Sequence, residues 1–155
     1  MDYRLWTKTY ELPMSNAFEI YGGKPLKGEI IPQGAKNEAL QILSAVLLTS
    51  EKITVSNIPD IKDVNKLIEL LGDMGVIVEQ LAPDTYSFEA KIFDQDFFVS
   101  DAFKAKGGGL RGSIMIVGPL LARFGKASIP KPGGDKIGRR RLDTHFLGFE
   151  KLAII

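Results

Sequence analysis

The chain has 155 residues, 45% of them hydrophobic, and a formal net charge of +1; this suits one ordinary globular domain and excludes a polycation that recruits nucleic acid as a whole. It has no cysteine and one histidine, which excludes disulfides, a thiolate zinc site and any site that needs two histidines, so we predict neither metal nor cofactor. No apolar stretch is long enough to span a bilayer and the amino terminus has no apolar secretory core, so the expectation is a cytoplasmic protein that does not bind membranes.

The first predicted elements are a strand pair and a helix. Residues 1–15 have no clear period and are predicted to be an N-terminal extension. Alternating residues predict strands at Phe18–Tyr21 and Leu26–Ile31, joined by a Gly-Gly turn. Ala35–Leu48 is predicted to be a helix. Because its apolar residues cover nearly the whole circumference, we expect this helix to be buried on all sides.

A strand, a second helix and a hairpin follow. Lys52–Ser56 is rich in β-branched residues and predicts a short strand. Apolar residues at helical spacing predict a helix at Ile61–Met74, ended by Gly75. Val76–Glu79 and Thr85–Glu89 then predict a hairpin around a Pro-Asp turn.

The same order of elements begins again in the second half of the chain. Gly34–Leu48 aligns with Gly107–Leu121 at an offset of 107 − 34 = 73. The strand at Ile53–Val55 then matches Lys126–Ser128. This registration predicts an internal β-α-β-α-β-β repeat of roughly 75 residues and therefore an α+β fold.

The repeat sets the expected domain organisation. We expect residues 16–155 to form one partial domain, with the first repeat over about 18–90 and the second over about 91–155. The second repeat lacks its closing hairpin. Its last helix is therefore expected to leave apolar surface uncovered, which indicates a fragment and favours self-association.

Lys36 and Asn37 open the first predicted helix. A helix amino terminus has free N–H groups and a partial positive charge, so it attracts anions. A lysine there is electrostatically unfavourable unless an anion joins it. The pattern favours an anion site over the alternative, a lysine whose ammonium extends into solvent.

A glycine-rich stretch, Lys106–Ser113, occupies the equivalent position in the second repeat. Glycine lets the backbone approach a ligand closely, and Arg111 is predicted to lie in the first turn of the following helix. A flexible linker with a surface arginine is equally compatible with the sequence.

The run Pro132–Arg141 combines a Pro-Gly-Gly turn, one carboxylate and three arginines. Clustered guanidinium groups grip phosphate or carboxylate through paired hydrogen bonds. Asp135 beside such a clamp is a candidate for delivering a proton to a phosphorylated substrate. The alternatives are a solvated basic turn, in which Asp135 only completes the turn, and for nearby His145 a capping or partly buried histidine.

Together these motifs resemble the enolpyruvyl transferase family. The similarity runs from about Phe18 to Ala153 and matches the opening third or so of a family member. It rests on several motifs in order: Gly34–Leu40, Leu110–Ser113, Gly118–Gly125, Pro132–Gly138 and Arg140–His145.

The resemblance implies a role for each matched residue. Lys36 and Asn37 match residues that bind phosphoenolpyruvate, and Arg140 matches an arginine on its phosphate. Asp135 matches the general acid that protonates the methylene carbon of phosphoenolpyruvate. The positions that hold a UDP-sugar are matched by Arg111, Arg140, Arg141, Leu142, Asp143 and Thr144.

The implied reaction transfers enolpyruvyl from phosphoenolpyruvate to the 3-hydroxyl of UDP-N-acetylglucosamine, the first committed step of peptidoglycan synthesis. The implied fold has two domains, each an inside-out α/β barrel of three β-α-β-α-β-β units with buried helices. This chain is truncated within the second unit, so the resemblance implies a fragment that cannot turn over alone. Many members carry cysteine where this chain has Asp135, and the epoxide antibiotic fosfomycin alkylates that thiolate, so we expect fosfomycin resistance.

Other functions remain open. The nearest is the sister reaction of the same family, enolpyruvyl transfer to shikimate 3-phosphate, although the Pro-Gly-Gly-Asp loop suits the UDP-sugar better. A nucleic-acid-binding module would use Arg139–Arg141, but the charge is near neutral and no aromatic residues alternate with the basic run. The third is a non-catalytic fragment that binds anions or a partner.

Overall fold

The computed structural model describes residues 22, 23, 25, 27–91, 97, 100–130 and 142–152. The chain divides into two units, residues 1–31 and 32–155. The described residues of the first unit are exposed and belong to no helix or strand. The predicted strand at Leu26–Ile31 is therefore wrong for residues 27–31, because no described strand pairs with their backbone. Its predicted partner, Phe18–Tyr21, lies outside the described residues.

Within its described residues, the second unit contains helices and one small sheet. Its helices are α1 (Lys36–Ala45), the 3₁₀ helix η1 (Val46–Leu48), α2 (Lys62–Asp73), α3 (Asp101–Gly108), the 3₁₀ helix η3 (Arg111–Ile116), α4 (Val117–Phe124) and α5 (Asp143–Lys151). Its strands are β1 (Lys52–Val55), β2 (Ile77–Ala82) and β3 (Thr85–Glu89).

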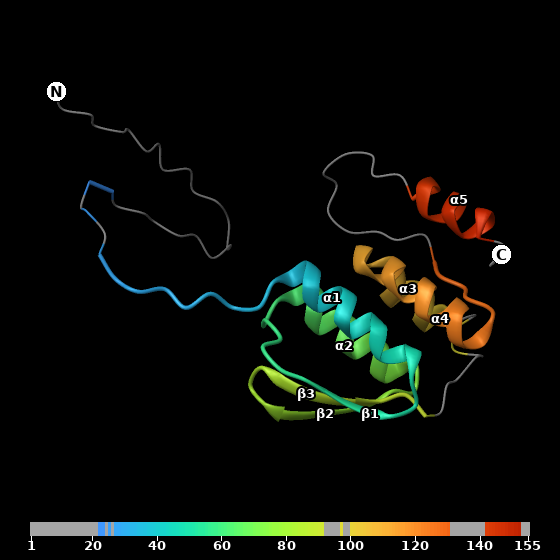
Figure 1. Cartoon of the computed structure of the whole chain (residues 1–155), viewed down its shortest axis with the longest axis horizontal. Helices are drawn as coiled ribbons and strands as arrows, with labels where there is room; N and C mark the ends of the chain where they lie inside the picture. Colours follow the sequence, from blue (N-terminus) through green and yellow to red (C-terminus); the bar gives the residue numbers. More distant parts are fainter. Residues whose placement is uncertain are drawn as a thin grey trace. The chain divides into compact units, whose positions relative to one another are not determined.

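The sheet is antiparallel, in the order β1-β3-β2, and one of its faces is covered by helices. Figure 1 shows α1 and α2 side by side across that face. Ile53 of β1, Phe88 of β3 and Val78 of β2 are register partners, and Phe88 is buried in the main core. Pro83 and Asp84 form the turn between β2 and β3. The predicted strand at Lys52–Ser56 and the predicted hairpin are confirmed.

The second predicted helix is also confirmed, as α2. Its apolar residues recur three or four positions apart, so they form one stripe that faces the sheet and α1. The helix ends before Gly75, whose φ of 96° is a conformation that favours glycine. The buried residues of α2 are Val64, Leu67, Leu70 and Leu71.

The first predicted helix is confirmed as α1 continued by η1, but its expected burial on all sides is wrong. Leu40 and Leu43 are buried, whereas Ile42 is 48% exposed and Leu48 is 52% exposed. The physical reason is that α2, η3 and α4 cover only part of the circumference, and no described element covers the remainder. Apolar composition alone does not bury a helix face; a partner must cover it.

The sequence did not predict α3. Ser100 caps this helix by accepting a hydrogen bond from the backbone N–H of Phe103 at 3.1 Å, and Phe103 is fully buried. The helix continues into the glycine run, for which a flexible linker was one of two equally compatible interpretations. A Cβ at Gly107 would lie 2.9 Å from a side-chain carbon of Pro130, so this glycine permits close packing.

The rest of the second half contains a predicted helix and lacks a predicted strand. The helix implied by the alignment of Gly107–Leu121 with Gly34–Leu48 is present from Arg111 onward as η3 and α4, and Gly125 follows it with a φ of 69°. Residues 126–130 form no strand, so the strand expected at Lys126–Ser128 is wrong. No described strand lies beside them to pair with their backbone.

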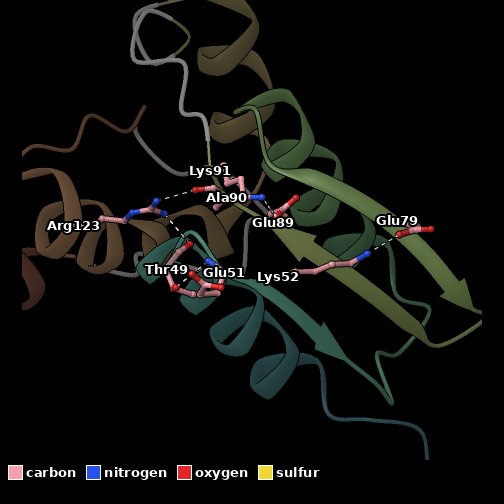
Figure 2. A network of polar contacts seen from close by, with 8 residues as sticks. All are labelled: Thr49, Glu51, Lys52, Glu79, Glu89, Ala90, Lys91 and Arg123. Atoms are coloured by element: carbon pink, nitrogen blue, oxygen red, sulfur yellow. Dashed lines mark hydrogen bonds and ion pairs between the residues drawn. The ribbon is translucent and has the colours of Figure 1, made fainter.

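Arg123 of α4 joins the two halves of the second unit, which are residues 32–91 and the described residues from 97 onward. Figure 2 shows its guanidinium directed at the end of η1 and at the end of β3. It donates hydrogen bonds to the carbonyl oxygens of Leu47 at 3.0 Å, Thr49 at 2.9 Å and Ala90 at 2.9 Å. The carbonyls at a helix end have no partner within the helix, so a cation there supplies the missing donors.

Candidate functional site

Lys36 lies where the sequence predicted, as the first residue of α1. The preceding residue, Ala35, is extended and supplies no side-chain cap, so a cap does not occupy the free N–H groups of the first turn. The Lys36 ammonium lies 2.8 Å from the Oδ2 atom of Asp63, and the two side chains are 43% and 42% exposed. Asn37, the second residue of α1, is exposed.

A close backbone contact fixes the entry into α1. A Cβ at Gly34 would lie 2.1 Å from the carbonyl oxygen of Asn57, a distance that no side chain tolerates. Asn57 itself has a φ of 59°, a left-handed conformation that is uncommon outside glycine. The segment before α1 is thus held against the segment after β1. A hollow of about 90 Å³ lies at this contact, lined in part by Glu38 and Ser56.

Asp63 lies in the first turn of α2, next to the start of α1. The contact between Lys36 and Asp63 shows that the amino termini of α1 and α2 lie at the same end of the helix pair. The residue before α2, Ile61, also supplies no side-chain cap. The Asp63 carboxylate thus lies in the first turn of α2 and contacts the ammonium of Lys36, the first residue of α1.

Arg111 is the first residue of η3 and is half-buried. A Cβ at the next residue, Gly112, would lie 3.1 Å from the Cδ1 atom of Leu40 in α1. This glycine therefore serves the packing of η3 against α1, one helical turn after Lys36. The fold thus brings the two predicted motifs, which are 111 − 36 = 75 positions apart, to neighbouring helix starts.

The remaining predicted site residues lie near α5 or outside the described part of the chain. Leu142 directly precedes α5 and packs against a small core cluster of Ile114, Val117 and Leu121. The first two helical residues, Asp143 and Thr144, are exposed, as is His145. The predicted acid and the predicted arginine cluster lie outside the described residues: Asp135, Arg139, Arg140 and Arg141.

Among the described residues, no group of three or more His, Asp or Glu side chains is arranged to hold a metal ion. Within the same residues, no helix has the length and apolar character needed to cross a bilayer.

The sequence analysis did not identify Asp63 as the partner of Lys36. Its carboxylate precedes an apolar helical pattern, which marks the start of a helix. That signal places Asp63 in a first turn but does not reveal that the turn lies beside Lys36.

A comparison with protein families gives the class. Residues 20–154 match the family described as EPSP synthase (3-phosphoshikimate 1-carboxyvinyltransferase). The match covers most of the chain, and its mixed helices and small antiparallel sheet agree with an α+β enolpyruvyl transferase domain. The chain belongs to this family.

Curated relatives show a more particular resemblance. The chain is 61% identical over 136 residues to a Bacteroides fragilis protein named UDP-N-acetylglucosamine 1-carboxyvinyltransferase. Proteins of the same name from Porphyromonas gingivalis and Bradyrhizobium diazoefficiens are 57% and 44% identical over 136 and 133 residues. These alignments cover 88%, 88% and 86% of this chain but 31%, 31% and 30% of the relatives. The chain therefore spans about a third of the length of these relatives.

Proposed function

We propose that this chain forms part of an enzyme that transfers enolpyruvyl from phosphoenolpyruvate to the 3-hydroxyl of UDP-N-acetylglucosamine in peptidoglycan synthesis. The observation that carries the proposal is that η3, which begins with Arg111, packs at Gly112 against Leu40, one helical turn after Lys36 in α1. The identity of 57–61% to relatives named for this reaction supports it.

In this proposal the start of α1 binds the anionic groups of phosphoenolpyruvate. The Lys36 ammonium supplies charge, and Asn37 supplies an amide donor. Arg140 adds a second cation on the phosphate. Physically, these groups stabilise the negative charge that develops as phosphate leaves a tetrahedral intermediate.

A second set of residues holds the sugar nucleotide. Arg111 lies one residue from the η3–α1 contact, so its backbone is fixed by that packing. The UDP moiety is anionic, and guanidinium groups bind its phosphates with paired hydrogen bonds. In the proposal Arg111 and Arg140 share this set with Arg141, Leu142, Asp143 and Thr144.

Asp135 is proposed as the general acid that protonates the methylene carbon of phosphoenolpyruvate. A carboxylic acid donates a proton near neutral pH when adjacent anions or burial favour its protonated form. A carboxylate also lacks the thiol chemistry that an epoxide exploits, so we propose that fosfomycin does not inactivate the enzyme.

The proposal favours UDP-N-acetylglucosamine over shikimate 3-phosphate as the acceptor. The family description names the shikimate reaction, but the relatives at 40–61% identity are named for the UDP-sugar. A nucleic-acid-binding role has no comparable support, since the net charge is +1. Because the chain spans 31% of the relatives' length, we propose that it supplies part of the cleft and releases no phosphate from the two substrates alone.

Calorimetric titration of UDP-N-acetylglucosamine into the chain tests this function. We expect saturable binding that is lost in Arg111→Ala and in Arg140→Ala. Lys104→Ala is the matched control, because it removes an exposed cation of α3 that pairs with Asp101. Equal binding by all four proteins would contradict the assigned sugar-nucleotide residues. Binding of random oligonucleotide with a steep salt dependence would favour the nucleic-acid function instead.

A further inference from the structure

Asp63 occupies a position where the fold favours an anion. Its carboxylate lies 2.8 Å from the Lys36 ammonium, and α1 and α2 both begin here without a side-chain cap. The free N–H groups and dipoles of two adjacent helix starts add to the charge of the lysine. The carboxylate therefore satisfies the same electrostatic demand that a bound phosphate or carboxylate would satisfy.

The ion pair between Lys36 and Asp63 is weak enough for a bound anion to replace it. Both side chains are more than two fifths exposed, so water screens their attraction, and such pairs stabilise a protein only slightly. A dianion can accept more hydrogen bonds from an ammonium and helix N–H groups than the Asp63 carboxylate does at its single 2.8 Å contact. The paired state is thus suited to the protein without ligand.

We propose that Asp63 is a positioning residue: it holds the Lys36 ammonium at the start of α1 until the anionic group of the ligand displaces it. This inference rests on the proposed function of Lys36 as an anion ligand. Asp63 acts through Lys36 and need not touch the reacting atoms. Asp63 also competes with the ligand for the Lys36 ammonium, so the ligand's contact with Lys36 replaces the ion pair between Lys36 and Asp63.

Titration with inorganic phosphate at low ionic strength, followed by calorimetry or by ³¹P chemical shift, tests the competition. Asp63→Asn removes the competing charge while keeping a similar shape, and we expect phosphate to bind about two- to fivefold more tightly, the range that an exposed ion pair supports. Asp63→Glu restores the charge and should bind phosphate as the unaltered chain does. An unchanged or lower affinity in Asp63→Asn would overturn the proposal.

A matched control separates this role from a general effect of removing an acid at a helix start. Asp101 also lies in the first turn of a helix and also pairs with a lysine, Lys104, at 3.0 Å. Asp101→Asn should leave the affinity for phosphate unchanged. If it tightens binding as much as Asp63→Asn does, the effect is one of overall charge and the proposal fails.

A measurement without ligand tests the positioning directly. Carbon-13 relaxation of the Lys36 ε-methylene should show a less mobile group in the unaltered chain than in Asp63→Asn. Equal mobility would overturn the proposal even if no variant bound phosphate. The proposed function is tested separately by Lys36→Ala: phosphate binding that survives this change would remove Lys36 as an anion ligand, whereas the relaxation result would still decide whether Asp63 holds it.

Discussion

The two halves of the second unit contain helices that align in sequence but differ in what covers them. The predicted repeat aligns Leu71-Gly72 of α2 with Leu147-Gly148 of α5 at an offset of 147 − 71 = 76, yet Leu71 is fully buried and Leu147 is 51% exposed. In the first half a three-stranded sheet and α1 cover α2. In the second half the described residues contribute no strand, and none of the residues of α5 is buried.

This difference shows that the apolar pattern of a helix indicates which face it could bury. Whether that face is buried depends on the elements that pack against it. Both helices carry leucines at corresponding positions, and burial is worth about 25 cal/mol for each Å² of apolar surface removed from water. Leu71 gains that free energy because it is fully buried, whereas half-exposed Leu147 gains less of it. The packing around α2 should therefore contribute more to stability than the packing around α5.

The largest expected effect comes from truncating the matched leucines. Leu71→Ala deletes a fully buried side chain and should lower the free energy of unfolding by about 2–5 kcal/mol, because it leaves a cavity in the main core. Leu147→Ala removes a half-exposed side chain and should change that free energy by no more than about 0.5 kcal/mol. Urea denaturation of both variants gives the two values.

The same pair of variants tests whether α2 and α5 differ in burial in solution. Equal losses would mean that α5 is buried in solution, for instance by self-association of the chain. Sedimentation at two protein concentrations distinguishes that case, because a loss caused by an interface between copies depends on concentration.

The second-largest effect is expected at the junction of the two halves. Arg123→Ala removes three hydrogen bonds from a charged donor, to Leu47, Thr49 and Ala90, and should cost about 2–3 kcal/mol of unfolding free energy. Arg123→Lys keeps the charge but has no planar fork to reach both η1 and the end of β3, so it should recover less than half of the loss. Full recovery by lysine, measured by thermal or urea unfolding, would show that charge alone matters.

The local elements of the first half were predictable because their signals lie within a few residues of each other. The spacing of Leu67, Leu70 and Leu71 defines α2, and the Pro83-Asp84 turn defines the hairpin. By contrast, α3 includes Gly107 and Gly108, which oppose a helix by their conformational freedom. Its support comes from the Ser100 cap and the packing of Phe103, and packing is a tertiary effect.

The candidate site shows the same limit: the position of a residue on its helix was predictable from local sequence, but a contact between two helices was not. Lys36 and Arg111 were predicted at helix starts, and both lie there. The partnership of Lys36 with Asp63 joins residues 63 − 36 = 27 positions apart. No local pattern encodes it, because it depends on how two helices pack. The roles of Asp135, Arg140 and Arg141, which lie outside the described residues, stay predictions from the family resemblance.

The smallest expected effect concerns the outer face of the sheet, which is the face that the helices do not cover. Among the described residues, only the first half contains a sheet. Lys52 of β1 reaches Glu79 of β2 at 3.1 Å across the central strand (Figure 2). The hydrogen bond from Lys52, then its charge, and then the Ser87 hydroxyl lower the pKa of Glu79 below its ordinary value of 4.5. A lowered pKa in the folded state means that the stabilisation is present above pH 4.5 and is lost as the pH falls through the folded value.

A carbon-13 titration of the Glu79 carboxyl measures this shift. In Lys52→Ala the pKa of Glu79 should rise toward 4.5, and the difference in urea midpoint between this variant and the unaltered chain should shrink at acidic pH. The pair formed by Lys91 and Glu89 at the end of β3 provides the opposite case, since Glu89 raises the pKa of Lys91 above 10.5. Its stabilisation is present below pH 10.5 and is lost as the pH rises through the folded value. An unchanged titration of Glu79 in Lys52→Ala would show that the pair across β3 does not persist in water, and that the sheet stabilises the first half through its buried face alone.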